Sequence, residues 1–320
     1  MANHIVETPG EPGGSAPRRL TQAVDDVRQI AASSSTSSEA RARSVATARA
    51  AIRVFDEYNL SQLPGSVVDQ AFIITTLQEL AYHDIDGGAI TDIAEWCMGR
   101  WLALSQNHAA RVAAFRGLGQ AWLARSQSLL ARIHRLEGSS SSGSSGRPQS
   151  LGERFPYTSS EETRDAERAT AEADARTHSP DYVEARGLLI PAVDHYTRAL
   201  ELAESQGSVH GDILAEAAEA NMSLGNVSSS HGNDRYFHTA IRYLRRASAI
   251  PGYVLSPYLQ RCIRTLRISY FRTNKTAVIW TTMGDWSIRF LLFRRVSNQR
   301  WLRYLVQSAG RDVLMKAALC

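Results

Sequence analysis

Two short stretches of the sequence carry residue types that can bind metal ions. The first, Tyr82–Gly88, contains a histidine and two aspartates before a pair of glycines. Calcium loops between helices need further oxygen ligands and a terminal Glu at fixed offsets, and this stretch has neither. In the second, His231 and His238 flank Gly232-Asn233-Asp234, but no carboxylate or cysteine stands at a spacing typical of zinc ligands. We therefore predict no metal site.

The motifs of covalent and phosphate chemistry are also missing. The sequence has no G-x-S-x-G nucleophile elbow and no G-x4-G-K-[ST] phosphate loop. Gly117-Leu118-Gly119 has neither a preceding strand pattern nor the third glycine of a dinucleotide-binding turn. Cys97 lies within Ile93–Met98, a pattern typical of a buried helix face, where a thiol is a small hydrophobic group rather than a nucleophile. We predict a non-enzymatic protein that binds no cofactor.

The cysteines also bear on the compartment of the protein. Cys97, Cys262 and Cys320 are widely spaced, odd in number and without a CxxC pair, which favours neither a disulfide framework nor a zinc site. The first residues lack the charged-then-apolar order of a secretory signal, and no apolar run approaches the roughly 18 residues of a membrane span. We predict a soluble cytoplasmic or nuclear protein.

The elements that must position these residues are predicted to be helices. Apolar residues recur at helical spacing, and Gly, Pro and Asn interrupt the pattern at Leu63-Pro64-Gly65, Asp86-Gly87-Gly88 and Gln106-Asn107. The expected helices cover 39–58, 67–83, 89–106, 108–125, 128–136, 159–176, 182–205, 211–227, 236–249 and 257–267. Pro191 should kink or break the helix that contains it. We therefore predict an all-α fold.

Composition divides the chain into five parts. We predict a disordered N-terminal tail over 1–38, in which only 20–32 has a short helical pattern, and a helical region over 39–137. A Ser/Gly-rich linker follows over 138–158, because this composition buries too little apolar area to offset the entropy of ordering. A second helical region covers 159–267, and an irregular basic, aromatic tail covers 268–320.

A repeated packing pattern recurs in the second helical region. Two eight-residue blocks, Ala192–Ala199 and Ala240–Ala247, start and end with a small residue, carry a large one between, and lie 48 positions apart. Residues at this spacing share one face of a helix and suit close helix-on-helix contact. Repetition at a fixed period is typical of stacked helix pairs, which usually form binding surfaces.

Phe115-x2-Leu118-Gly119-x2-Trp122 resembles the first-helix signature W-x2-L-G-x2-Y of the tetratricopeptide repeat. Leu224-Gly225 resembles the centre of that signature, and the two small-large-small blocks, the second followed by Pro251, resemble its second helix. The departures are Asn221 and Ser228, which stand where aromatic residues are expected, and a spacing longer than the usual 34 or so residues.

The resemblance implies antiparallel helix pairs stacked as a superhelix, in which Gly119 and Gly225 let the second helix approach the first. Family members hold a partner peptide in a groove lined by first helices. The matching positions in this sequence are Arg116, Gln120, Met222 and Asn226. Asn226 and Arg116 supply an amide and a cation of the kind that peptide-carboxylate clamps use, but Met222 does not fit such a clamp. The alternative is an ordinary helix bundle in which these four are plain surface residues.

Charge is distributed unevenly along the chain. The formal net charge is +4, yet the last sixty residues hold 12 Lys/Arg and 2 Asp/Glu. One interpretation is a basic patch that contacts nucleic acid or anionic membrane through Arg294, Arg295, Arg300 and Arg303. A second is an anomalous extension without a function of its own, and a third is a short β-hairpin formed by 275–281 and 287–293.

These observations favour an interaction protein. We predict a scaffold or adaptor that binds a protein or peptide partner in a helical-repeat groove. The alternatives are a regulatory protein that reaches nucleic acid or membrane only through its basic tail, and an accessory protein of a biosynthetic pathway. An ordered polar pocket with convergent titratable groups would favour the last.

Overall fold

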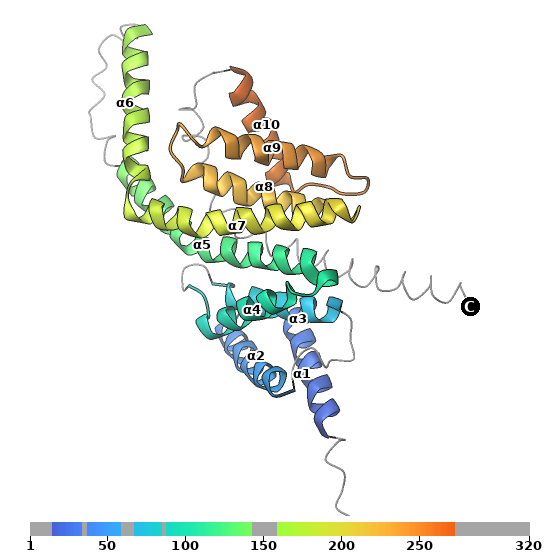
Figure 1. The fold of residues 1–320 in the computed structure, drawn as a ribbon. Coiled ribbons are helices and arrows are strands. Elements are labelled where there is room, and N and C mark those ends of the chain that lie inside the picture. Colours follow the sequence, from blue (N-terminus) through green and yellow to red (C-terminus); the bar gives the residue numbers. More distant parts are fainter. Residues whose placement is uncertain (1–14, 34–36, 59–66, 85–87, 143–158, 273–320) are drawn as a thin grey trace, which may run out of the picture. The chain divides into compact units, whose positions relative to one another are not determined.

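The computed structural model describes residues 15–33, 37–58, 67–84, 88–142 and 159–272 (Figure 1). All regular secondary structure in these ranges is helical, and they contain no strand. The predicted all-α fold is therefore confirmed. The basic-tail arginines and the predicted hairpin lie outside the described residues.

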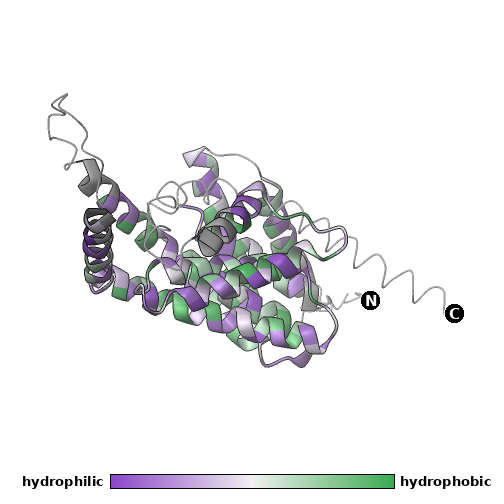
Figure 2. Ribbon diagram, turned by 90° about the horizontal axis from the view of Figure 1, so that it is seen from above, coloured by the Kyte–Doolittle hydropathy of each residue, from purple (hydrophilic) through white to green (hydrophobic). Residues whose placement is uncertain are grey.

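The described helices form two compact units. The first unit contains four helices: α1 (Ser15–Ala32), α2 (Ser38–Tyr58), α3 (Val67–Ala81) and α4 (Thr91–Leu104). The second contains a short 3-10 helix and six α-helices: η3 (His108–Ala110), α5 (Arg111–Ser142), α6 (Ser159–Thr177), α7 (Pro180–Ser205), α8 (Gly211–Asn226), α9 (Asp234–Ser248) and α10 (Pro257–Arg272). Hydrophobic and hydrophilic residues alternate along these helices (Figure 2), as in amphipathic helices that bury one face.

Helix α1 differs from the disordered tail that we predicted over 1–38. It packs against α2 and α3 of the first unit and buries Leu20, Ala23, Val24 and Val27. These four residues follow the i, i+3, i+4, i+7 spacing of a single helix face. The short helical pattern at 20–32 was therefore a correct signal of structure, and its apolar face is what holds the helix to the unit.

The core of the first unit is apolar and is joined by a few polar contacts between helices. Phe55 of α2, Ile73 of α3 and Trp101 of α4 are fully or almost fully buried. The indole nitrogen of Trp101 donates to Gln78 Oε1 at 2.9 Å, and both side chains are buried. A buried indole N–H is costly without an acceptor, so this hydrogen bond fixes the position of α4 on α3.

Helices α5, α7, α8 and α9 form the main stack of the second unit. Helix α7 lies between α5 and α8, and α9 packs on the other side of α8 (Figure 1). Arg132 near the end of α5 binds Asp181 at the start of α7, with N–O distances of 2.6 and 3.1 Å. Phe115 near the start of α5 stacks on His195, with ring centroids 5.9 Å apart. The two helices therefore run antiparallel.

Two glycines allow close contact between paired helices. A Cβ atom at Gly119 of α5 would lie 2.9 Å from the ring of Tyr196 on α7, and one at Gly225 of α8 would lie 2.9 Å from the ring of Phe237 on α9. The predicted role of both glycines in close helix approach is confirmed. The register differs, however: Tyr196 follows the first alanine of its block by four residues, whereas Phe237 precedes Ala240 by three. The two pairs are therefore not copies with one register.

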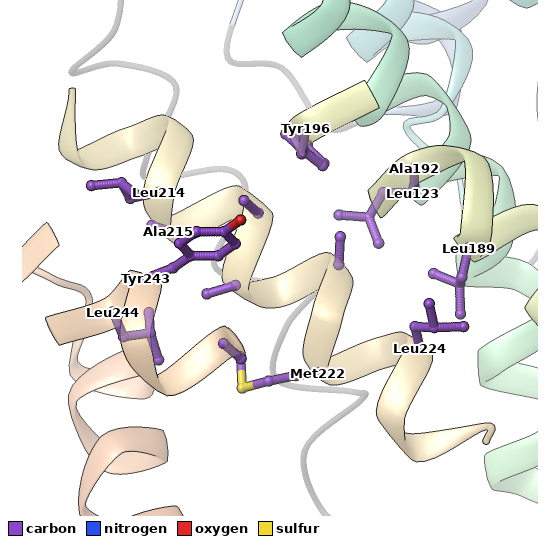
Figure 3. Packing of buried hydrophobic residues seen from close by; sticks show 14 of the residues in the cluster. Leu123, Leu189, Ala192, Tyr196, Leu214, Ala215, Met222, Leu224, Tyr243 and Leu244 are labelled. Atoms are coloured by element: carbon purple, nitrogen blue, oxygen red, sulfur yellow. The ribbon is translucent and has the colours of Figure 1, made fainter. Parts of the chain in front are cut away.

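The apolar core of the second unit covers both sides of α8 (Figure 3). Tyr243 and Leu244 approach α8 from α9, and Met222 points toward them. On the opposite side, Leu224 meets Leu189 of α7. Because α8 is covered on both sides, most of its side chains are buried.

Two predicted interruptions are absent. Helix α5 continues through the expected break between 125 and 128, because the buried Ser126 hydroxyl donates to the Leu123 carbonyl at 2.7 Å and needs no other acceptor. Helix α7 continues through Pro191. The backbone bond that Pro191 cannot donate would go to Gly187, which is exposed, so water can satisfy that carbonyl.

The unit boundary lies elsewhere than the Ser/Gly-rich composition indicated. We predicted two helical regions, 39–137 and 159–267, with a linker between them. In the structure α5 pairs with α7, and both belong to the second unit. The two helices are antiparallel, so the C-terminal part of α5 lies beside the start of α7, as the Arg132–Asp181 contact shows.

Candidate functional site

A polar cluster connects α5 and α8 in the second unit. Arg116 and Gln120 stand four residues apart on α5, and both reach Glu216 of α8. Arg116 donates from Nε and Nη2 at 2.9 and 2.6 Å, and Gln120 Nε2 lies 3.0 and 3.1 Å from the two carboxylate oxygens. The side chains of Arg116 and Glu216 are only 13% and 23% exposed. This two-point arginine–carboxylate contact is therefore both geometrically specific and largely removed from water.

Helix α8 contributes a row of three carboxylates to this cluster. Asp212, Glu216 and Glu219 recur at i, i+4 and i+7 and share one helix face. Tyr253, in the turn after α9, donates its hydroxyl to Asp212. Burial raises the pKa of Asp212, and the nearby Glu216 adds to the increase, while Arg116 opposes it. Burial and the same carboxylates also raise the pKa of Tyr253, so this phenol stays protonated and remains a donor.

Arg116 keeps its charge in this environment. Burial by itself lowers its pKa, but the charge and hydrogen bonds of Glu216 outweigh that effect, and the net pKa is raised. His210, just before α8, has a lowered pKa because of burial and the nearby Arg116. The cluster is therefore built on a hydrogen-bonded ion pair between Arg116 and Glu216.

The thiols in the two units are buried and unreactive at neutral pH. Burial raises the pKa of Cys262 to about 12, although a hydrogen bond with Tyr258 lowers it in part. Burial also raises the pKa of Cys97, whose side chain is fully buried. Because the thiolate is the nucleophilic form, neither residue is poised for covalent chemistry.

The four predicted groove residues do not share one environment in the structure. It brings Arg116 and Gln120 together on Glu216. Met222 is 3% exposed and belongs to the core between α8 and α9, so its side chain does not line an open surface. Asn226, the last residue of α8, is half-buried. The partner-binding role of these positions stays a prediction.

Sequence reasoning missed Glu216, the residue that organises the cluster. The available signal was the acidic row on α8, whose carboxylates could pair with an arginine such as Arg116. The two residues are 100 positions apart, however, and only the packing of α8 near α5 brings them together.

The metal-like stretches do not form a ligand set in the described part of the chain. No group of three or more His, Cys, Asp or Glu side chains there is arranged to hold a metal ion. His231 lies 3.6 Å from Asp174, but its side chain is 88% exposed. Part of the first stretch, 85–87, lies outside the described residues.

Neither a search for membrane-spanning helices nor comparison with known proteins assigns a function to the chain. None of the helices in the described ranges combines the length and apolar composition that a membrane span requires. Comparison with protein-family models, with curated proteins and with solved structures finds no match to this chain. The resemblance of Phe115–Trp122 to the tetratricopeptide repeat therefore stays a prediction.

Proposed function

We propose that the chain is a non-enzymatic interaction protein whose surface across α5 and α8 binds a segment of a protein partner. The antiparallel pairs α5–α7 and α8–α9 support this proposal, because stacked helix pairs present continuous surfaces formed by successive first helices. Gly119 and Gly225 each allow a close approach of two helices, as the tetratricopeptide resemblance implies, although the two pairs differ in register. The single observation that carries the proposal is the Arg116–Glu216–Gln120 cluster, which joins the two first helices into one polar surface.

The charge of this surface favours a basic partner. Helix α8 carries three carboxylates, at Asp212, Glu216 and Glu219, and Arg116 is already paired with one of them, Glu216. A peptide carboxylate would have to displace Glu216 to reach Arg116. The three carboxylates of α8 outnumber this arginine and so attract Lys or Arg side chains, and we therefore propose a basic peptide segment as the occupant.

Peptide display against the full chain tests this proposal. Selected peptides should contain Lys or Arg and should bind the D212N/E219Q variant about tenfold more weakly. The variant removes two charge contacts, which together contribute about 1.4 kcal/mol, and this energy corresponds to a tenfold change in affinity. Both substitutions keep the side-chain shape and leave the Arg116–Glu216 pair intact.

The matched control is D194N/E201Q, which removes two exposed carboxylates from α7. It should bind the same peptides as tightly as the wild type. Enriched peptides that bind all three proteins equally well would show that the α5–α8 surface is not the binding site.

We also propose that the protein works in the cytoplasm or nucleus. The buried free thiols of Cys97 and Cys262 support a reducing compartment. Fluorescence microscopy of the tagged full chain tests this location, and retention in the secretory pathway would contradict it.

A further inference from the structure

Helix α9 has a face that carries four arginines and a histidine, with the exposed carboxylate of Asp234 at its N-terminal end. Arg235, Arg242, Arg245 and Arg246 are exposed, and His238 is exposed on the same side. These positions follow i, i+3, i+7, i+10 and i+11, which places them on one helix face. At 1.5 Å per residue the row is about 16 Å long. We call these five residues the α9 arginine face.

No acidic residue interrupts the sequence after Asp234 until the end of α10. Between 235 and 272 the chain has eight arginines and no Asp or Glu. Two of them, Arg261 and Arg264, are exposed on α10, which packs against α9. The basic character therefore belongs to both helices, although Glu219 of α8 lies near Tyr258 and Cys262 of α10.

Local stability explains only part of this face. Arg245 and Arg246 are in the last turn of α9, where cations stabilise a helix, and Arg246 binds Glu204 of α7 at 2.6 Å. Neither explanation applies to Arg235 or Arg242. Their guanidinium groups instead lie over tyrosine rings, 4.6 Å from the Tyr236 centroid and 5.6 Å from the Tyr243 centroid. Such contacts hold the groups in place before a ligand arrives.

The chemistry of the face favours phosphate as the ligand. All four of its permanent cations are arginines, whose planar forks bind phosphate oxygens at two points. A row of positive charges complements a polymer that carries one negative charge on every unit, as a nucleic acid does. A lipid surface fits less well, because membrane-binding helices insert their apolar side. The apolar side of α9, with Phe237, Leu244 and Ala247, is buried in the core.

We infer that the α9 arginine face binds the sugar–phosphate backbone of a nucleic acid without reading its sequence. This site is separate from the α5–α8 surface and goes beyond the proposed peptide binding. It also differs from a site on the C-terminal tail, because it is formed by residues of the folded second unit.

Fluorescence anisotropy with the full chain and a labelled 20-nucleotide single strand tests the inference. We expect binding that weakens with salt. The R242E/R245E variant should bind about tenfold or more weakly at low salt and should show a less steep salt dependence, by about 1.4 in the log–log slope, because two phosphate contacts are lost. A duplex of the same length and a second sequence should behave alike.

The matched control is R43E/R53E, which makes the same charge change at two exposed arginines of α2. It should bind nearly as tightly as the wild type. Equal losses in the two variants would mean that only total charge matters, and no loss in R242E/R245E would mean that another part of the chain binds. Either result overturns the inference.

Two further arms exclude other occupants and a folding defect. Vesicles containing phosphatidylserine replace the oligonucleotide in one arm, and binding to vesicles alone overturns the inference in favour of lipid. The milder R242Q/R245Q variant is used if circular dichroism shows that R242E/R245E loses helix. It should retain the wild-type spectrum and show the same decrease in slope.

Discussion

At the scale of single residues, the second unit depends on positions where no side chain fits. Gly119 faces the ring of Tyr196, which is 1% exposed and surrounded by core residues. A flexible neighbour could move aside for an added methyl group, but a buried ring cannot do so without disturbing its own contacts. Glycine in a helix normally costs about 0.5–1 kcal/mol relative to alanine, so this glycine is retained at a cost in helix propensity.

We predict that G119A lowers the free energy of unfolding by about 1–2 kcal/mol, because overpacking in a rigid core outweighs the gain in helix propensity. The control is G187A, where an added Cβ has no atom within 4 Å, and this change should stabilise the protein slightly. Urea unfolding of both variants measures the effect. A G119A protein as stable as G187A would show that α5 and α7 are not in close contact.

The same scale shows why the candidate site was only half predictable. The pattern around Phe115 pointed to Arg116 and Gln120, and the structure brings both to one carboxylate. Spacing in the sequence says nothing about partners 100 residues away, so Glu216 could not be inferred from it. Met222 was placed on an open surface because a helical signature does not show that α9 covers that side of α8.

At the scale of elements, the sequence predicted where helices occur better than where they end. Gly207 adopts a positive φ angle of 62° just after α7, as glycine commonly does after a helix. Gly252, with a φ angle of 77°, lies in the turn that the Tyr253 amide closes on the Ile250 carbonyl. The predicted helices 108–125 and 128–136 are one continuous helix in the structure. The Ser126 hydroxyl bonds to the Leu123 carbonyl of its own helix, and sequence alone does not show whether a serine will do so or end the helix.

Helix α6 is connected to the loop after α8 through one carboxylate. Asp174 accepts hydrogen bonds from the amide and hydroxyl of Ser230, both at 2.9 Å. The Ser230 amide is the largest cause of the lowered pKa of Asp174. Because the folded-state pKa lies below the unfolded value of about 3.9, the contact contributes its full stability above that pH and loses it as the pH falls through the folded-state value.

We predict that the exchange protection of the Ser230 amide, corrected for the intrinsic rate, falls between pH 5 and pH 2.5 in the wild type. In D174N the protection should be lower at pH 5 and change little with acidification, because the titrating group is gone. The E172Q variant alters an exposed carboxylate on the same helix and should behave like the wild type. Hydrogen exchange measured by NMR gives all three profiles, and equal protection in D174N and wild type would rule out this tether.

At the scale of the whole molecule, the important finding is where one folding unit begins. Composition placed a linker at 138–158, between two helical regions. The structure joins α5, which begins before that stretch and extends into it as far as Ser142, to α7, which follows it. Composition measures how readily a segment becomes ordered, but it does not show which elements pack on either side of the segment.

We predict that a fragment covering residues 105–272 unfolds cooperatively by itself. A fragment covering 159–267, which follows the compositional boundary, should lack a cooperative transition, because removing α5 exposes the buried ring of Tyr196, which lies against Gly119 of α5. Circular dichroism during urea titration compares the two. Cooperative unfolding of the shorter fragment would mean that α5 is not part of its core.

The buried thiols of Cys97 and Cys262 can report how often each unit opens. Cys97 lies in α4 of the first unit and Cys262 in α10 of the second. A maleimide reagent reaches either sulfur only when the surrounding helices separate, so labelling rates report the frequency of opening in each unit. In a chain with Cys320 replaced by serine, two modification rates from one mass-spectrometric experiment would show whether the units open together or independently, without any introduced probe.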